Sequence, residues 1–365
     1  MQPASAAQPA RVVEYGGAAT AERFSDPHEE FAALQSACGV YDLGFRARIS
    51  LKGGDRVRWM NGMVTNNIRD LAVGQGAYAF LLNPQGRILG DMTVYNLGET
   101  IEVETDRSQV EKIIATFDHY IIMDDVEVTN LSEAWTVLGL AGPKSRALLN
   151  AAGIKVPELQ PLQMIALQCN CDCGCVECTL IRGQDAPSES YEIWLAPGDV
   201  LKTWRALIAA GATPVGVEAL EMRRIAASIP LYGVDIRERD LPQETEQMRA
   251  LNFNKGCYVG QEIVERIRSR GNVHRKFTGF LLDGAANIAT GDKIISGEKE
   301  VGEITSVATL QASSGEQTVA LGYIRRELGV PGREVTIGEH KATVAQLPLE
   351  CVAFGQTEDA VLHKV

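Results

Sequence analysis

The chain has 365 residues, with 35 Lys or Arg against 47 Asp or Glu, and its net charge of −12 excludes a broad nucleic-acid surface. A content of 45% hydrophobic and 22% charged residues is typical of a globular protein with two or three domains and excludes general disorder. No apolar run reaches the ~18 residues of a membrane span and the start lacks a secretion signal, so we expect a cytoplasmic protein.

The N-terminal part predicts an arm, a helix and a strand. Residues 1–24 are rich in Ala, Pro and Gly without a sustained period, which predicts a mobile arm. A helix is expected after Asp26, because an N-cap residue is followed by Pro at the first helical position and by Glu29 at the third, as in a capping box. Gly39 ends this helix. The alternation of apolar and polar residues over 45–51 then predicts a half-buried strand.

The middle of the chain mixes strands with short helices. Apolar residues at helical spacing predict helices over 110–117 and 200–207. Strand-like runs cover 77–82, 88–97 and 135–140. These runs do not alternate strictly with helices, so an α+β fold is favoured over a doubly wound parallel sheet.

The C-terminal part predicts a separate β domain. From residue 277 onward, short apolar runs recur between Gly-rich turns, over 277–282, 301–307, 319–324 and 335–337. This spacing is typical of a small antiparallel barrel or sandwich.

The most specific segment lies just before that domain. It consists of Lys255, Gly256, Cys257, Tyr258, Val259, Gly260, Gln261 and Glu262. Two glycines around a thiol and an aromatic ring predict a tight turn, since glycine permits positive φ. A cation two residues before the sulfur favours the thiolate, which makes Cys257 a candidate nucleophile or redox-active thiol. The alternative is a small hydrophobic side chain buried in a turn.

This segment resembles the K-G-C-Y-x-G-Q-E signature of the YgfZ-type folate-binding proteins, relatives of the glycine-cleavage T protein (aminomethyltransferase). The flanks agree, because L-P-Q-E at 241–244 and R-G-N-V-H-R at 270–275 look like the family's L-P-x-E and R-G-x-V-x-R. G-V-Y-D-L at 39–43 and L-L-N-P-Q-G-R at 81–87 also fit. The resemblance extends over about residues 14 to 355.

The resemblance implies a ring of three subdomains, with two intertwined α+β units and a C-terminal antiparallel β-barrel. It implies tetrahydrofolate or a derivative as cofactor, and a role in assembly or maintenance of iron–sulfur enzymes, including a tRNA-modifying radical enzyme. Its partners would be folate and iron–sulfur client or assembly proteins, with no direct nucleic-acid contact, and the protein would be a monomer. The expected parts are a mobile arm (1–24), a folate-binding region (25–262), a barrel with a basic lead-in (263–355) and a tail (356–365).

Two T-protein motifs are partly preserved in the first half. The run at 86–95 resembles G-G-x-x-D-D-x-x-V-Y but keeps only the second aspartate, as Asp91. The resemblance implies that Asp91 orients the folate N5 and N10 region or acts as a base, and the alternative is a solvated or sheet-capping carboxylate. Glu192 matches the glutamate that grips the pterin ring, whose adjacent donors suit a carboxylate. Without the match it would be read as a surface charge.

A third motif covers residues 220–233, which resemble R-x-E-A-G-x-P-x-Y-G. Arg224 and Tyr232 fit, whereas Ala226 and Ser228 replace the family's Glu and Gly. Arg224 would hold a folate carbonyl or carboxylate through its planar fork of donors. The departures favour a folate pocket without T-protein-type aminomethyl transfer.

Two further features have alternative interpretations. The segment 255–276 holds six Lys or Arg and two Glu, a net +4, and predicts either a local anion or partner site or a solvated face.

Five of the eight cysteines are crowded together: Cys169, Cys171, Cys173, Cys175 and Cys178. They would share one face of a strand or flank a hairpin turn at 172–174. Four thiolates are enough for zinc or an iron–sulfur cluster, but the spacing matches no common ligand pattern, which favours a thiol-rich hairpin without metal.

Three functions follow as hypotheses. The preferred one is a tetrahydrofolate-binding accessory protein for iron–sulfur enzymes, and the alternatives are a folate-dependent aminomethyl or one-carbon transferase and a thiol-based metal or redox protein.

Overall fold

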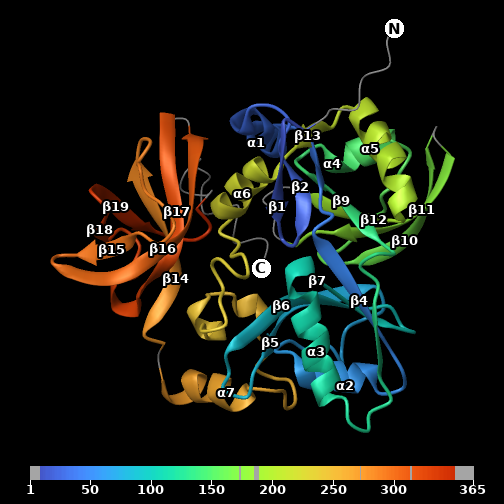
Figure 1. Ribbon diagram of the computed structural model, residues 1–365, viewed down its shortest axis with the longest axis horizontal. Coiled ribbons are helices and arrows are strands. Elements are labelled where there is room, and N and C mark those ends of the chain that lie inside the picture. Colours follow the sequence, from blue (N-terminus) through green and yellow to red (C-terminus); the bar gives the residue numbers. More distant parts are fainter. Residues whose placement is uncertain (1–8, 172–173, 185–188, 272, 313–314, 350–365) are drawn as a thin grey trace. The chain divides into compact units, whose positions relative to one another are not determined.

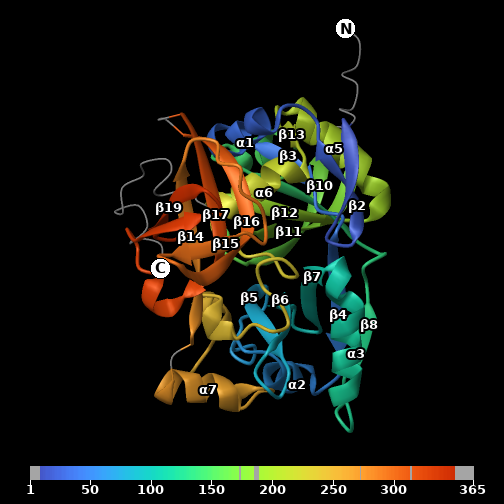
Figure 2. The same cartoon turned by 60° about the vertical axis from the view of Figure 1, so that its left-hand side comes forward.

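The computed structural model describes residues 9–171, 174–184, 189–271, 273–312 and 315–349 (Figures 1 and 2). The chain divides into two compact units that interleave along the sequence. Unit 1 contains the residues up to Leu81, Gly90–Leu220 and Asn252–Val259; unit 2 contains Leu82–Leu89, Glu221–Leu251 and the residues from Gly260 onward. Within the described residues, no helix is both long and apolar enough to cross a membrane.

Unit 1 opens with a hairpin where the sequence predicts a mobile arm. Strand β1 (Arg11–Tyr15) pairs antiparallel with β2 (Ala18–Arg23). Gly16 and Gly17 form the turn between them with φ of 59° and 91°. Two successive residues with positive φ are the requirement of a tight hairpin turn, so this Gly-Gly pair is the signal that corrects the expectation for residues 11–23. Residues 1–8 lie outside the described part.

A six-stranded sheet forms one half of unit 1, in the order β10-β11-β12-β9-β3-β13. Its strands are β3 (Gly39–Asp42), β9 (Thr136–Ala141), β10 (Met164–Cys171), β11 (Gly174–Arg182), β12 (Ser190–Leu195) and β13 (Thr213–Val215). The helices along this part of the chain are α1 (Pro27–Ser36), α4 (Ser145–Ala151) and α5 (Val200–Ala209). Asp26 caps α1 as predicted, through its side chain on the His28 N–H.

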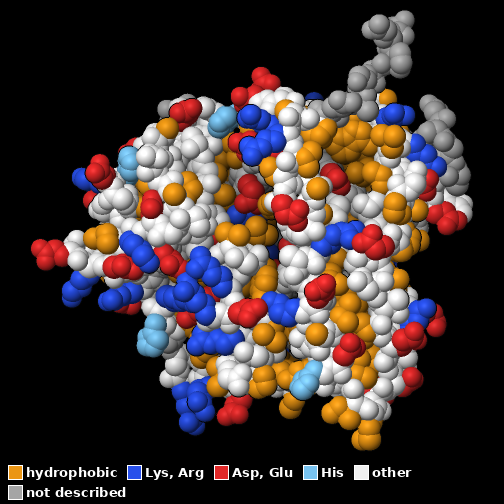
Figure 3. Space-filling model, in the orientation of Figure 1, with side chains coloured by type: hydrophobic (Ala, Val, Ile, Leu, Met, Phe, Trp, Pro, Cys, Tyr) orange, Lys and Arg blue, Asp and Glu red, His pale blue; other side chains and the backbone are white. Residues whose placement is uncertain are grey.

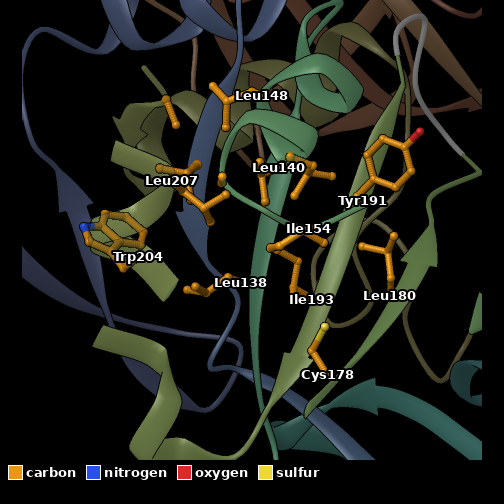
Figure 4. Close-up of a cluster of buried hydrophobic side chains, with 14 of the residues drawn as sticks. Leu138, Leu140, Leu148, Ile154, Cys178, Leu180, Tyr191, Ile193, Trp204 and Leu207 are labelled. Atoms are coloured by element: carbon orange, nitrogen blue, oxygen red, sulfur yellow. The ribbon is translucent and has the colours of Figure 1, made fainter. Parts of the chain in front are cut away.

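One face of this sheet carries an apolar core (Figure 4). Leu138 and Leu140 of β9 and Ile193 of β12 pack with Leu148 of α4 and Leu207 of α5. The predicted stripe of α5 is largely confirmed, because Leu207 is fully buried, but Leu201 of the same stripe is 53% exposed. Of the residues of α5, those on its inner side contribute to this core.

A five-stranded sheet, in the order β5-β6-β7-β4-β8, forms the other half of unit 1. Its strands are β4 (Arg46–Lys52), β5 (Gln75–Leu82), β6 (Ile88–Asn96), β7 (Ile101–Asp106) and β8 (Glu127–Asn130), with helices α2 (Arg56–Met63) and α3 (Val110–Tyr120). The alternation over 45–51 predicts the strand correctly but its burial wrongly. Residues 47–51 of β4 are all buried, since the polar side chains are covered as well as the apolar ones.

Unit 2 contains a closed antiparallel barrel, in the order β14-β17-β16-β15-β18-β19, which confirms the predicted barrel and the α+β fold class. The strands are β14 (Arg275–Asp283), β15 (Lys293–Ser296), β16 (Lys299–Ala312), β17 (Gly315–Arg325), β18 (Glu334–Ile337) and β19 (His340–Ala345). Helix α7 (Gln261–Arg270) precedes these strands. The boundary between Leu220 of unit 1 and Glu221 of unit 2 lies within helix α6 (Val217–Ala226). Apolar residues such as Phe280, Ile304 and Ile324 fill the interior. The expected tail at 356–365 lies outside the described residues.

The contrast on α5 gives a stability test. Leu207→Ala removes a fully buried side chain and leaves a cavity, so the free energy of unfolding is expected to fall by about 2–5 kcal/mol. Leu201→Ala makes the same chemical change at an exposed position of the same helix and is expected to cost less than ~0.5 kcal/mol. Denaturant unfolding of both variants checks this, and equal losses would contradict the core described here.

Candidate functional site

The two sheets of unit 1 enclose a layer of polar side chains, which we call the polar layer. It consists of Arg46, Arg48, Asp91, Glu102, Glu104, Asp106 and Glu192. Alternation along the strands produces it, because Ala47 and Ile49 of β4 are buried in the apolar core while their neighbours face the other way. The strand register places Arg46 opposite Asp106 and Arg48 opposite Glu104, so opposite charges meet across β4 and β7.

Arg46 is the central cation of the polar layer. Its Nε donates to Glu104 Oε1 at 2.7 Å, and its Nη1 donates to Asp106 Oδ1 at 2.5 Å. Both acidic residues are buried, since Glu104 is 4% exposed and Asp106 is 6% exposed. Burial alone would lower the pKa of Arg46, but the surrounding carboxylates outweigh it and raise that pKa, so Arg46 stays charged. Burial also raises the pKa of Asp106, against the opposing effect of Arg46.

Glu192 projects into the polar layer from β12. Its Oε2 accepts a hydrogen bond from Trp194 Nε1 at 3.3 Å. Burial raises the pKa of Glu192 to about 8, repulsion from Glu104 adds to this, and Arg46 opposes it. The protonated form of Glu192 is therefore favoured at neutral pH.

Arg48 lies beside this group, between two indole rings. Its guanidinium carbon is 5.3 Å from the Trp135 ring centroid and 5.6 Å from that of Trp194. Nε donates to Glu102 Oε2 at 3.1 Å, whereas Nη1 is buried without a hydrogen-bond partner among the described residues. The polar layer thus contains one buried donor that still requires an acceptor.

Asp91 of β6 is partly exposed and is held by hydrogen bonds to both of its oxygens. Tyr78 Oη donates to Oδ2 and Gln109 Nε2 donates to Oδ1, each at 2.8 Å. The Gln109 side-chain oxygen also accepts the Asp91 backbone N–H at 3.1 Å. Asp91 contributes to the raised pKa of Asp106, so it belongs to the same electrostatic group. Two of the predicted site residues, Asp91 and Glu192, therefore meet in one layer.

The signature segment is anchored by Lys255 in unit 1. Its Nζ donates to the backbone carbonyl oxygens of Asn61, Val64 and Asn66 at 2.5, 2.6 and 2.7 Å, and lies 5.0 Å from the Tyr258 ring centroid. Burial lowers the pKa of Lys255 to about 7. Three carbonyl acceptors oppose that shift, because a neutral amine could donate only two hydrogens. Lys255 is therefore an ammonium that shapes the loop.

Cys257 is exposed, as expected for an accessible thiol. The ammonium expected to activate it directs its three donors to the carbonyls of the 61–66 segment instead. The reactivity of Cys257 stays a prediction.

The signature segment is divided between the units, and Gly260 is its first residue in unit 2. Its φ is 81°, and a Cβ there would lie 2.6 Å from the Asn83 carbonyl oxygen, so glycine is required at this position. Gln261 and Glu262 form the first turn of α7.

Arg224 has a structural environment in unit 2. Its five N–H donors go to Glu221, which takes two, and to Asp235, Ser306 and the Ile229 carbonyl oxygen. A folate carboxylate could contact Arg224 only by displacing one of these partners. Asp235, fully buried and absent from our predicted residues, is the acceptor that organises this group.

Tyr232 donates its hydroxyl hydrogen to the Leu89 carbonyl oxygen at 2.6 Å. This bond lies within unit 2 and ties the 221–251 segment to the 82–89 turn. Tyr232 is therefore positioned by main-chain contacts, and its expected part in folate binding stays a prediction.

The cysteine-rich segment forms a hairpin at the backbone level. Strands β10 and β11 pair antiparallel, with Asn170 opposite Cys175 and Cys171 opposite Gly174. Cys178 is buried in the core of the six-stranded sheet. Residues 172–173, with Cys173, and the side chains of Cys169, Cys171 and Cys175 lie outside the described part. Among the residues that are described, no group of three His, Cys, Asp or Glu is placed to hold a metal ion.

Sequence reasoning missed the acidic strand β7 and its basic partner β4. The usable signal was the pair of runs R-A-R-I-S at 46–50 and E-V-E-T-D at 102–106, with two arginines at alternate positions in the first and three acids at alternate positions in the second. Complementary charges on two alternating strands indicate a buried ionic face when the other face is apolar.

Comparison with known proteins agrees with this architecture. The model of the GCVT N-terminal domain matches residues 1–255, and that of the glycine cleavage T-protein C-terminal barrel domain matches residues 275–349. The chain belongs to the glycine cleavage T-protein family.

Its relatives in this family include named transferases. It is 28% identical over 344 residues to an aminomethyltransferase of Rubrobacter xylanophilus, covering 93% of this chain and 90% of the relative. It is 27% identical to a putative chloroplastic transferase of Arabidopsis thaliana, covering 90% of this chain and 74% of the relative. The crystal structure of the glycine cleavage system aminomethyltransferase T from Bartonella henselae superposes with a TM-score of 0.83 at 21% identity, covering 93% and 94% of the two chains. That similarity shows the fold.

The proton on Glu192 gives a pH-dependent prediction. Glu192 ionises near 4.5 in the unfolded chain and near 8 in the folded protein, so between these pH values the folded state holds one more proton and loses stability as the pH rises. Glu192→Gln mimics the protonated form and is expected to remove this loss. Unfolding free energies at pH 5 and pH 8 check it, with the exposed Glu111→Gln as control. An unchanged pH dependence in Glu192→Gln would contradict the assignment.

The Lys255 anchor gives a second prediction. Lys255→Met leaves three buried or partly buried carbonyl oxygens without the ammonium donor and is expected to lower the free energy of unfolding by about 2 kcal/mol. Cys257→Ser, two residues away and exposed, is the control and is expected to stay within ~0.5 kcal/mol of the parent protein. Comparable losses in the two variants would show that the anchor is misassigned.

Proposed function

We propose that this protein binds a reduced folate in the polar layer of unit 1 and transfers a one-carbon group carried on it. The observation that carries the proposal is the Asp91 carboxylate, held in one orientation by Tyr78 and Gln109 beside the Glu192 and Arg46 group. Membership in the glycine cleavage T-protein family and the named aminomethyltransferases among its relatives support it. The preserved Asp91 and Glu192 favour this reading over the accessory role preferred from the sequence.

The donors and acceptors of the polar layer fit a reduced pterin. A pterin presents an amino group and a ring N–H side by side, together with a carbonyl oxygen. Glu192 is an acceptor for adjacent N–H donors once its proton leaves, and Arg48 Nη1 is a buried donor that needs an acceptor. When bound, tetrahydrofolate supplies nitrogens that carry and release a one-carbon unit.

The chain's own residues supply orientation and proton handling. Each Asp91 oxygen already accepts one hydrogen bond and has a second lone pair for a substrate N–H, so Asp91 can bind a donor or take its proton. Arg46 holds Glu104 and Asp106 in place. Because the five acidic residues of the polar layer outnumber its two arginines, the layer favours a ligand that presents N–H donors or positive charge.

A second candidate, the folate-binding accessory protein for iron–sulfur enzymes, including indirectly a tRNA-modifying radical enzyme, has its own support. The loop anchored by Lys255 presents an exposed thiol, Cys257. The proposed one-carbon transfer in the polar layer does not use this thiol. The finer resemblance to the YgfZ-type proteins rests on this same loop.

Folate binding is tested by anaerobic calorimetric titration with tetrahydrofolate. We expect saturable binding that is at least about ten-fold weaker in Asp91→Asn, because the variant cannot accept a proton and loses one acceptor. Asp118→Asn, an exposed aspartate of α3, is the matched control. No binding at millimolar folate would overturn both candidates.

Turnover separates the two candidates. Formation of methylenetetrahydrofolate from an aminomethyl donor, at least about 10²-fold slower in Asp91→Asn, supports the transferase. Folate binding without turnover, together with loss of iron–sulfur client activity in a deletion strain complemented with Cys257→Ser, supports the accessory role.

A further inference from the structure

Unit 2 has a pocket on the barrel that the folate proposal does not use. It measures about 420 Å³, within the range of small-molecule sites, and is broadly open to solvent. Four Lys or Arg and two Glu line it, together with His274 and Tyr323. In Figure 3, Lys and Arg side chains gather over the surface that β14, β15 and β16 occupy in Figure 1.

Two of the lining arginines face each other across neighbouring strands. The register of β14 and β17 pairs Arg275 directly with Arg325. Side chains at such positions point to the same face of the sheet with Cβ atoms about 4.5–5.5 Å apart, and like charges there repel. Arg325 is exposed and makes no ion pair or hydrogen bond through its side chain within the described residues. An anion that contacts both guanidinium groups would relieve the repulsion that remains after Asp240 and Glu244 have partly offset the charge of Arg275.

Arg275 is held rigidly at this position. Its Nη2 donates to Asp240 Oδ1 at 2.5 Å and to Glu244 Oε2 at 3.1 Å, and its guanidinium carbon lies 4.7 Å from the Tyr323 ring centroid. Only Nη2 is used in these bonds, so Nε and Nη1 have no partner in the part of the chain that the structure describes. A guanidinium fixed in this way loses little entropy when it binds an anion.

The acidic residues of the pocket are already neutralised. Glu303 accepts from Arg237 at 2.9 Å and from Arg239, and lies 3.5 Å from Lys293. Glu300 pairs with Lys293 at 3.1 Å. Arg275 is likewise paired, with Asp240 and Glu244, so among the described residues the Lys or Arg of the pocket without a carboxylate partner is Arg325.

We propose that this pocket binds a small polyanion, a molecule that carries two or more phosphate or carboxylate groups, between Arg275 and Arg325. Arginine forks bind either group through paired hydrogen bonds, and two facing guanidinium groups match two charges on one ligand. The charge of the segment 255–276 predicts either a local anion or partner site or a solvated face. Arg266 and Arg268 pair with glutamates of their own helix, whereas Arg275 of the same segment lines the pocket.

The test uses calorimetric titration of the full chain with two probes, pyrophosphate and tri-glutamate, at constant ionic strength. We expect at least one probe to bind at least about ten-fold more weakly to Arg325→Gln than to the parent protein. Arg333→Gln, an exposed arginine of unit 2 outside the pocket, changes the net charge equally and is expected to bind as the parent protein does. The probe that binds distinguishes a phosphate ligand from a carboxylate one.

Stability without ligand provides an independent readout. Arg325→Gln removes the like-charge pair, so its melting temperature is expected to be no lower than that of Arg333→Gln. A lower value, equal weakening of binding in both variants, or no binding of either probe at millimolar concentration would overturn the proposal. The experiment contains no folate, so its failure leaves the proposed function untouched.

Discussion

The ion pairs of the Arg46 guanidinium with two buried carboxylates are the contacts on which the candidate site depends. Two sheets whose facing surfaces carry arginines and acids cannot pack together unless each charge has a partner, because an unpaired buried charge costs several kcal/mol. Arg46 supplies that partner to Glu104 and Asp106. The remaining acid, Glu192, satisfies the same requirement by holding a proton. The packing of the polar layer and the proton on Glu192 thus have one electrostatic cause.

The elements with a strong hydrophobic period could be predicted from the sequence. Helices α3 and α5, strand β9 and the barrel strands follow patterns that their own residues impose. The failures came from positions where a second layer of structure decides. Strand β4 has the alternation of a half-buried strand, but β7 and the facing sheet cover its polar side, and nothing within 46–52 indicates which residues lie opposite.

The site was predictable in part for the same reason. Asp91 and Glu192 were found through a resemblance, whereas Arg46, Glu104 and Gln109 join them only through strand register and packing. Two cations of the recognised motifs, Lys255 and Arg224, have their donors engaged within their own units. A basic residue in such a motif can therefore stabilise the loop that carries the motif.

The interleaving of the two units has a consequence for how the protein is made. The chain passes between the units at residues 81/82, 89/90, 220/221, 251/252 and 259/260. Unit 1 lacks its last segment until residue 259 has left the ribosome, so it cannot complete its fold as an independent N-terminal domain during synthesis. The segment 221–251, which includes Arg224 and Asp235, must in turn await the barrel strands translated after it. No single proteolytic cut or truncation separates the units into two complete pieces, and a stop codon before residue 259 would leave both incomplete.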